Sequence, residues 1–297
     1  MIRKGLAELK ARGLRAVLTA VFRRLIPRRF SSYRRYKPFF QDRIGLEIGG
    51  SSGMFERRGY LPIYTLAARV DNCNFGHRTI WEGAIEEGAT FRFNKRRAPG
   101  NQYIAEATDL GHIEPASYDF VLSSHTLEHI ANPLKALSEW IRILKDEGVL
   151  VLVVPHKDGT FDHRRPVTSL QHLIQDFENH VTEADLTHLN EIIELHDLAQ
   201  DPEAGALQAF KQRSQRNLEN RCLHHHVFDT RLAVEVVHYM GLKILDVAAF
   251  HPFNILIIAQ KPARASQFLN DRFRDLNTTP CWHSPFPSDQ PALPKKV

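Results

Sequence analysis

The feature that most constrains the fold is an uninterrupted apolar run, GVLVLVVP, at residues 148–155. Such a run is typical of a strand buried on both faces, as in the middle of a parallel sheet. A helix should precede it, because Asn132 can cap the segment NPLKALSEWIRILKDEG, Pro133 suits its first turn and Gly148 can end it. A helix that leads directly into a buried strand is typical of an α/β fold.

The chain repeats this alternation of strands and helices between residues 43 and 261. Its apolar segments predict strands at residues 43–48, 62–71, 103–107, 118–123, 148–155, 242–250 and 254–261. Only HPF separates the last two segments, so the last strand should run antiparallel as part of a hairpin. We therefore expect an α/β, doubly wound, mostly parallel seven-stranded sheet with an antiparallel last strand.

Three regions differ from this pattern. Residues 157–222 are polar and mostly helical in character, so we expect them to be an insertion within a domain that spans residues 43–261. Residues 262–297 are rich in Pro, Ser and Asn, which predicts a disordered tail. Residues 1–42 have apolar side chains at helical spacing with arginines between them, which predicts a basic amphipathic helical arm.

Positive charge is concentrated in this arm. Residues 1–43 contain 13 Lys or Arg and two acidic residues, so the rest of the chain carries −6 although the whole has a net charge of +5. The arm could pack on the domain, contact an anionic membrane through residues 1–30, or act as a transit peptide. Nucleic acid is a disfavoured partner, because the body that would hold it is acidic.

Cysteine usage and hydropathy bear on the compartment. The three cysteines are widely separated and form no C-x-x-C pair, so neither a disulfide framework nor a zinc ribbon is indicated. No apolar run approaches the roughly 20 residues that a membrane-spanning helix needs. We expect a cytoplasmic protein, with peripheral membrane contact as the alternative.

A glycine-rich turn, EIGGSSG at residues 47–53, follows the first expected strand. Closely spaced glycines let the backbone turn sharply and let a ligand approach it. Ligands of open α/β sheets bind beside the carboxyl ends of the strands. Asp71 ends the second expected strand, 22 residues after Gly49, where a carboxylate can accept ribose hydroxyls. The spacing G-G-S-S-G does not match G-x-G-x-x-G, which disfavours a nicotinamide dinucleotide.

These motifs together resemble the class I S-adenosylmethionine-dependent methyltransferases, and most of all the small-molecule branch that includes the quinone-biosynthesis enzymes. The resemblance is carried by E-x-G-x-S-x-G, by Asp71, by DFVLSSHTLEH and by LKDEGVLVLVVP. It implies S-adenosylmethionine as the cofactor. The residues that it assigns to cofactor binding are Glu47, Gly49, Gly50, Ser51, Gly53, Asp71, Asp109, Leu110 and Ser123. Asp71 would then bind the ribose, and Asp109 with Leu110 would contact the adenine.

The segment HKDGTFDHRR, residues 156–165, begins at the end of the fifth expected strand. Its density of functional side chains predicts a substrate-binding loop, with a charged surface turn as the alternative. Asp162, Arg164 and Arg165 are the candidate substrate ligands, since arginines suit a phosphate or carboxylate.

A hydroxyl acceptor would need a general base, and a histidine suits that role. The candidate catalytic residues are His125, His156 and His163. Eleven of the 16 histidines fall between His125 and His226, so a metal site is conceivable. We nevertheless expect no metal, because LEH at residues 127–129 recurs in resembling methyltransferases that use none.

We expect methyl transfer to a small-molecule or glycan-linked acceptor. A hydroxyl acceptor is favoured by the resemblance to enzymes of surface-glycan assembly. Two alternatives come from other classes of protein. One is a non-catalytic adenosyl-fold subunit that binds a partner, and the other is an RNA methyltransferase, whose body should be basic rather than acidic.

Overall fold

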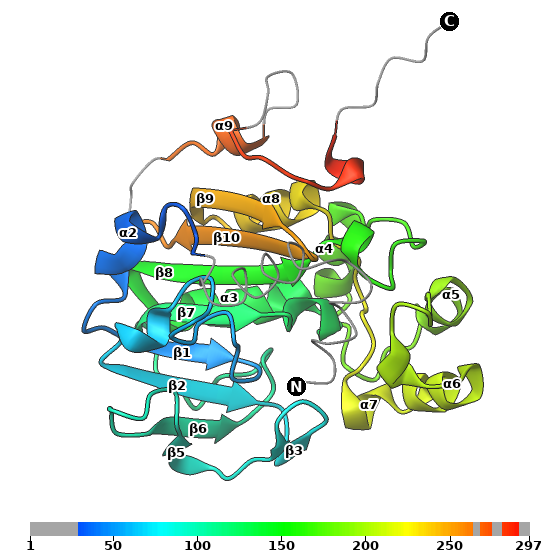
Figure 1. Cartoon of the computed structure of the whole chain (residues 1–297), viewed down its shortest axis with the longest axis horizontal. Coiled ribbons are helices and arrows are strands. Elements are labelled where there is room, and N and C mark those ends of the chain that lie inside the picture. The colour runs from blue at the N-terminus through cyan, green and yellow to red at the C-terminus, as the bar shows by residue number, and fades with distance from the viewer. Residues whose placement is uncertain (1–28, 264–267, 275–280, 291–297) are drawn as a thin grey trace, which may run out of the picture.

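The computed structural model describes residues 29–263, 268–274 and 281–290. Its main element is an eight-stranded sheet in the order β5-β6-β2-β1-β7-β8-β10-β9 (Figure 1). Its strands are β1 (Ile44–Ile48), β2 (Arg69–Asn74), β5 (Gly88–Phe91), β6 (Gly100–Ile104), β7 (Tyr118–Ser124), β8 (Leu144–Pro155), β9 (Lys243–Phe250) and β10 (Asn254–Gln260). A separate ribbon pairs β3 (Arg78–Thr79) with β4 (Gly83–Ala84).

The directions of the strands confirm the expected fold class. Strands β6, β2, β1, β7 and β8 pair in parallel, and β10 runs antiparallel between β8 and β9. Seven of the eight strands correspond to predicted ones. The additional strand is β5, which pairs antiparallel with β6 at the edge of the sheet. Its sequence, GATF, offers no apolar alternation that would have predicted it.

Two predicted strands are displaced along the chain. Residues 62–66 do not extend into β2; Ile63–Thr65 form a 3-10 turn (η2) in which Ile63 and Tyr64 are buried. Strand β2 therefore continues three residues beyond Asp71 and ends at Asn74. Strand β6 ends at Ile104, three residues before the predicted end. These shifts change which side chains stand at the carboxyl ends of the strands.

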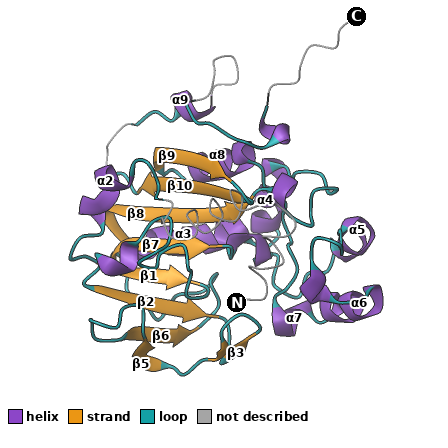
Figure 2. Ribbon diagram, viewed as in Figure 1, coloured by secondary structure: helices purple, strands orange, loops and turns teal. Residues whose placement is uncertain are grey.

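The two faces of the sheet are covered differently. The helices are α2 (Tyr33–Tyr36), α3 (Pro133–Ile143), α4 (Leu170–Glu178), α5 (Leu189–Leu195), α6 (Leu207–Gln215), α7 (Asn217–Asn220), α8 (Thr230–Tyr239) and α9 (Asp271–Arg274). Figure 2 shows α3 and α8 behind the sheet. They pack on it through one core cluster, to which Trp140 and Val236 belong. The other face carries an aromatic cluster under loops and short helical turns, with Phe40 packed edge-on against Phe120.

Side-chain caps account for where the two main helices begin. The Asn132 side chain accepts a hydrogen bond from the Lys135 amide at 3.1 Å, as its sequence predicts. Asp229 likewise accepts from the Leu232 amide at 2.7 Å at the start of α8. Between α3 and α8 the chain forms β8 and then the helices α4 to α7. These helices have a small apolar cluster of their own, formed by Ile192, Ala204, Phe210 and Leu223.

The C-terminal region is more ordered than its composition predicts. Within residues 268–274, the buried Asn270 accepts a hydrogen bond from the Ile244 amide and donates one to the Leu242 carbonyl. Within residues 281–290, Phe286 and Asp289 are buried against the domain. The prediction of a disordered tail is therefore wrong for these two segments. Their side-chain contacts with β9 and α8 are long-range and leave no local pattern in the sequence.

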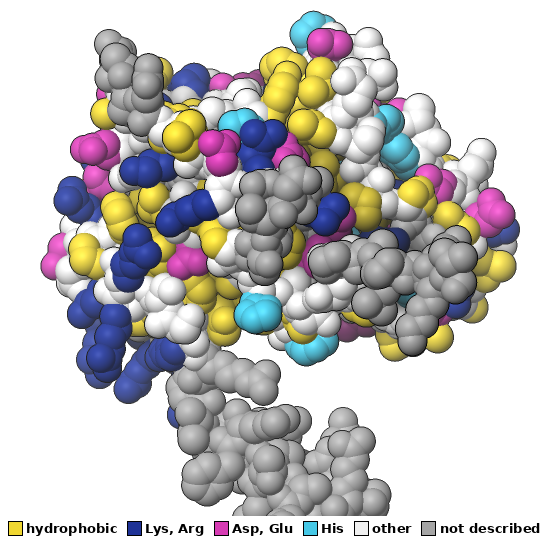
Figure 3. Space-filling model, turned by 90° about the horizontal axis from the view of Figure 1, so that it is seen from above, with side chains coloured by type: hydrophobic (Ala, Val, Ile, Leu, Met, Phe, Trp, Pro, Cys, Tyr) yellow, Lys and Arg dark blue, Asp and Glu magenta, His cyan; other side chains and the backbone are white. Residues whose placement is uncertain are grey.

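Most of the predicted basic arm lies outside the described residues. Its last part is described, and there Phe30, Tyr36 and Phe40 are buried in the aromatic cluster. Arg34 and Arg35 on α2 remain exposed. Figure 3 shows Lys and Arg side chains gathered at the side of the molecule where α2 lies. Among the described residues, no helix combines the length and apolar character needed to cross a membrane.

Candidate active site

A cavity of about 490 Å³ lies at the carboxyl ends of the parallel strands. Its wall is formed by the turns that follow β1, β2, β6 and β7, by the end of β8, and by two side chains from residues 221–224. This is where an open α/β sheet places its ligand. The volume suits a ligand of small-molecule size. Of the residues predicted for the site, Gly49, Gly50, Ser51 and His125 line this cavity.

The glycine turn has a shape that only glycine can adopt at its first position. Gly49 has φ +86°, and a Cβ atom placed there would lie 2.2 Å from Oγ1 of Thr126. The side-chain amide of Asn72 donates to the carbonyls of Gly49 and Gly50, at 2.7 and 2.6 Å. These contacts hold the turn against the sheet and keep its ligand-facing side open.

Glu47 supports the turn from beneath and does not line the cavity. Its carboxylate accepts hydrogen bonds from the Ser52 amide at 3.0 Å and from the Tyr64 hydroxyl. Burial raises the pKa of Glu47 to about 8, and these two hydrogen bonds only partly oppose the shift. Glu47, predicted as a cofactor-binding residue, therefore acts on the turn rather than on the cavity itself.

Asp71 is not at the site, and the ribose role predicted for it is contradicted by its position. Its carboxylate is fully buried within the sheet and accepts hydrogen bonds from the Asn101 amide and the Tyr118 hydroxyl, each at 2.8 Å. Arg69 lies 3.1 Å from the same group. Strand β2 extends to Asn74. Asn74 therefore lines the cavity at the end of this strand, where Asp71 was predicted to lie.

Four other predicted cofactor residues also lie outside the cavity wall. Asp109 is exposed, and Leu110 is buried under α3, where its amide donates to Glu139. Ser123 is fully buried on the face of β7 opposite to Ser124, and it is Ser124 that lines the cavity. Gly53 ends the turn and is not among the residues that line the cavity. Since β6 ends at Ile104, the wall after this strand is formed by Ala105–Ala107. Glu106 is the acidic residue of this segment, and it was not predicted from the sequence.

The loop after β8 is turned away from the cavity at two predicted catalytic residues. His156 is fully buried, with Nε2 3.2 Å from Oδ2 of Asp289 and its ring stacked on Phe286 at 4.0 Å. The C-terminal segment therefore covers it. His163 Nε2 lies 2.9 Å from Oδ2 of Asp197, also outside the cavity. The predicted catalytic roles of both histidines are thus contradicted by their positions.

The two arginines of this loop are likewise not substrate ligands in this arrangement. Arg164 is half exposed and pairs with Asp197 at 3.3 Å. Arg165 is 1% exposed and donates to Asp162 Oδ1 at 3.0 Å and to the His224 carbonyl at 2.8 Å. Arg165 fixes the backbone of a segment that does reach the cavity.

His224 lines the cavity and is held from behind by Asp162. The Nδ1 atom of His224 lies 2.5 Å from Oδ2 of Asp162, and both residues are largely buried. Burial disfavours the charged ring, but the carboxylate outweighs it and raises the pKa of His224. The pKa of Asp162 falls to about 2, because His224 and Arg165 outweigh its burial. Asp162 thus acts on the site only through His224. The feature of the sequence that could have indicated His224 is the triplet of histidines at residues 224–226.

Three further side chains of the LEH region face the same space. His125 has Nε2 3.0 Å from Oδ1 of Asn254. Burial lowers the pKa of His129 to about 4, and its Nδ1 lies 3.0 Å from the Leu223 carbonyl. Glu128, His129 and His224 each place one potential ligand atom within 4.8 Å of the others. This group places three titratable side chains together in the lining of the cavity.

Arg221 connects two carboxylates at the cavity wall. Its Nη2 lies 2.6 Å from Oε1 of Glu106, and its Nη1 lies 3.0 Å from Oε2 of Glu183. Trp81 stands at the mouth, 53% exposed, with its ring 5.2 Å from that of His129. The cavity therefore combines buried charged groups with an exposed aromatic rim.

A model of the family described as "Methyltransferase domain" matches residues 80–152. The matched stretch includes the cavity wall after β6 and after β7. The sheet is mostly parallel with an antiparallel strand near its edge, as the resemblance implied. This match and the fold support an enzyme that transfers methyl groups from S-adenosylmethionine.

The solved structures to which the chain is similar include methyltransferases. A SAM-dependent methyltransferase from Aquifex aeolicus is 12% identical, with a TM-score of 0.40 over 80% of this chain and 93% of that one. One from Methanosarcina mazei is 15% identical, with a TM-score of 0.42 over 79% of this chain and 99% of that one. No curated protein matches the sequence of this chain. Its assignment to the quinone-biosynthesis-like branch stays a prediction.

Proposed function

We propose that this methyltransferase transfers a methyl group to a hydroxyl of a small-molecule or glycan-linked acceptor, with His224 as the general base. The observation that carries this proposal is the contact between His224 and Asp162. Because Nδ1 is held by the carboxylate, Nε2 is the ring nitrogen left to accept a proton in the cavity. The buried carboxylate would fix the tautomer and stabilise the ring once it is protonated.

The chemistry explains why a base would be needed. S-adenosylmethionine supplies an electrophilic methyl group, so the protein must hold the acceptor in line with the bond that breaks. A neutral hydroxyl is a weak nucleophile until its proton is removed. The oxygen–methyl bond forms as the methyl–sulfur bond breaks, and the hydroxyl proton passes to Nε2 of His224.

Residues around the glycine turn fit the parts of the cofactor. The missing side chain at Gly49 would let the backbone approach the amino-acid end. Glu82, whose carboxylate accepts from the Ser51 amide at 2.9 Å, would pair with the ammonium group. Asn74 would meet the ribose hydroxyls at the end of β2, and Glu106 lies where the adenine would end.

The rim of the cavity supports a sugar-linked acceptor. Trp81 presents an exposed aromatic face beside the cavity, and the apolar face of a sugar ring can pack on such a surface. Arg221, Glu106 and Glu183 supply charged hydrogen-bonding groups at the wall. A purely apolar acceptor would remove these charged groups from water without adding any hydrogen bond to them, at a free-energy cost.

The test is a turnover assay with radiolabelled S-adenosylmethionine and a panel of methyl glycosides and phenols. We expect a base-stable methyl ether as the product. His224→Gln should lower kcat by about 10²–10⁴-fold, the range typical of a lost general base. Its affinity for S-adenosylhomocysteine, measured by calorimetry, should stay within about threefold of the parent.

The matched control is His163→Gln, which changes a histidine that also contacts an aspartate but lies outside the cavity. It should leave kcat unchanged. A base-labile methyl ester, or full turnover in His224→Gln, would overturn the proposal. Absence of S-adenosylhomocysteine binding in the unsubstituted protein would instead contradict the cofactor assignment.

A further inference from the structure

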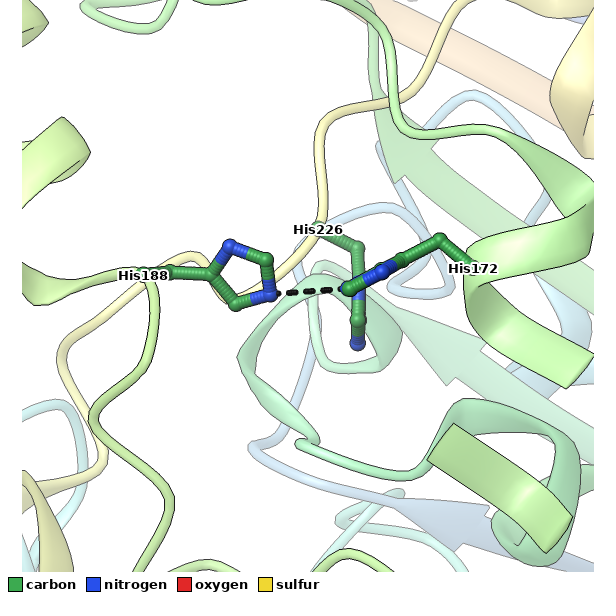
Figure 4. A group of neighbouring side chains, drawn as sticks. All are labelled: His172, His188 and His226. Atoms are coloured by element: carbon green, nitrogen blue, oxygen red, sulfur yellow. Dashed lines mark hydrogen bonds between the residues drawn. The ribbon is translucent and has the colours of Figure 1, made fainter. Parts of the chain in front are cut away.

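A second group of histidines lies outside the active-site cavity. His172 is on α4, His188 precedes α5, and His226 lies in the segment that leads to α8. Figure 4 shows His172 and His188 pointing toward each other, with His226 beside their contact. Their two Nε2 atoms are 3.0 Å apart, and each of the three histidines offers a ligand atom within 4.8 Å of the others.

Two buried atoms beside this group have no hydrogen-bond partner. His226 is 1% exposed; its Nε2 lies 3.2 Å from the Ala131 carbonyl, whereas its Nδ1 is unpartnered. Oδ2 of Asp176 is also unpartnered by a hydrogen bond, and it lies 3.4 Å from Nε2 of His172. Unsatisfied buried polar atoms are rare in folded proteins and call for a missing partner. A hydrogen bond between His172 and His188 alone would satisfy neither atom.

We propose that His172, His188 and His226 bind a zinc ion, with water as the fourth ligand. Three imidazole nitrogens and a water form a tetrahedral zinc site. Bonds of about 2.0–2.1 Å place tetrahedral ligand atoms about 3.4 Å apart, close to the 3.0 Å that separates Nε2 of His172 from Nε2 of His188. Oδ2 of Asp176, 3.4 Å from Nε2 of His172, lies beside the ion as a compensating negative charge. The Ala131 carbonyl would hold the His226 tautomer, as carbonyl groups do behind zinc-bound imidazoles.

The positions of these residues along the chain suggest what the ion would do. His172 and Asp176 are four residues apart on one face of α4. His188 and His226 come from two other segments, so the ion would join three parts of the chain. His226 is also two residues from His224, whose side chain lines the cavity. The ion would therefore hold the insertion, and with it the wall of the active site, against the domain.

Metal binding can be measured without any assay of methyl transfer. The full chain, purified without a histidine tag and treated with a chelator, would be titrated with Co(II). We expect one equivalent to bind with the visible absorption of a tetrahedral site, and Zn(II) to displace it. Zn(II) should also raise the melting temperature. His172→Gln and His188→Gln, both at partly exposed positions, should each weaken metal binding by at least about 100-fold. Even the loss of a residue that only hydrogen-bonds to a zinc ligand lowers metal affinity by about 10–100-fold.

Two controls distinguish this site from others. His180→Asn changes an exposed histidine close to α4 and should bind metal as the parent does. His129→Gln removes a histidine of the cavity group and should also retain the Co(II) spectrum. Absence of binding in the folded parent would overturn the proposal. So would binding that survives both His172→Gln and His188→Gln, or that is lost in His129→Gln alone.

Discussion

Nε2 of His156 lies 3.2 Å from Oδ2 of Asp289, although the two residues are far apart in the sequence. The same carboxylate accepts hydrogen bonds from the amide and the hydroxyl of Thr230, at 3.2 and 2.5 Å. The C-terminal segment is thereby tied to the first turn of α8 and to the residue that follows β8.

This contact predicts that the C-terminal segment contributes to stability. Asp289→Ala should lower the free energy of unfolding by about 2–4 kcal/mol, because it leaves the buried Thr230 and His156 without their partner. Denaturant unfolding measures the change. The control is Asp271→Ala, at an exposed position of α9, which should stay within about 0.5 kcal/mol of the parent. Equal stability of the two variants would contradict the role of Asp289.

The structure of the glycine turn predicts that substitutions of Gly49 and Gly53 differ in their effect on cofactor binding. Gly49→Ala should weaken S-adenosylhomocysteine binding at least about 10-fold, since the new Cβ would meet Thr126 and the residue would be strained at φ +86°. Gly53→Ala is the control, because nothing lies within 4 Å of a Cβ at that position. Calorimetric titration compares the two. Comparable losses in both would mean that Gly53 also contacts the cofactor.

The corrected position of Asp71 can be tested against that of Asn74. Asn74→Ala should weaken S-adenosylhomocysteine binding about 10-fold, the effect of one lost hydrogen bond. Asp71→Asn should leave that affinity unchanged and lower stability by about 1–3 kcal/mol, because its buried carboxylate holds Asn101 and Tyr118. Loss of cofactor affinity in Asp71→Asn, with stability preserved, would restore the ribose role first predicted for it.

The raised pKa of Glu47 predicts that the free energy of unfolding depends on pH. Its pKa is raised from 4.5 to about 8 by burial, so the folded chain keeps the proton at pH values where the unfolded chain has lost it. Its contribution to the free energy of unfolding therefore falls as pH rises from about 4.5 to about 8. Glu47→Gln should remove this slope, and denaturant unfolding across that pH range tests it. An unchanged slope in the variant would contradict a protonated Glu47.

Local patterns in the sequence were sufficient for the fold class. The run at residues 148–155 and the cap Asn132 act through neighbouring residues, so the strand and the helix they predict are present in the structure. The turn at Gly49 was found for the same reason, because the need for a positive φ is a property of the residue itself. Strand ends were less certain, since the buried turn at Ile63–Thr65 has the apolar character of a strand.

The sequence by itself thus determined the α/β sheet, its antiparallel hairpin and the glycine turn, because these depend on hydrophobic period and backbone conformation. Only the tertiary structure decided which polar side chains reach the cavity. His156 and Arg165 look functional in the sequence but are buried by contacts with Asp289 and with the backbone of His224. Asp162 and His224 meet across 62 positions of the chain. Such pairings arise from packing, and no local pattern records them.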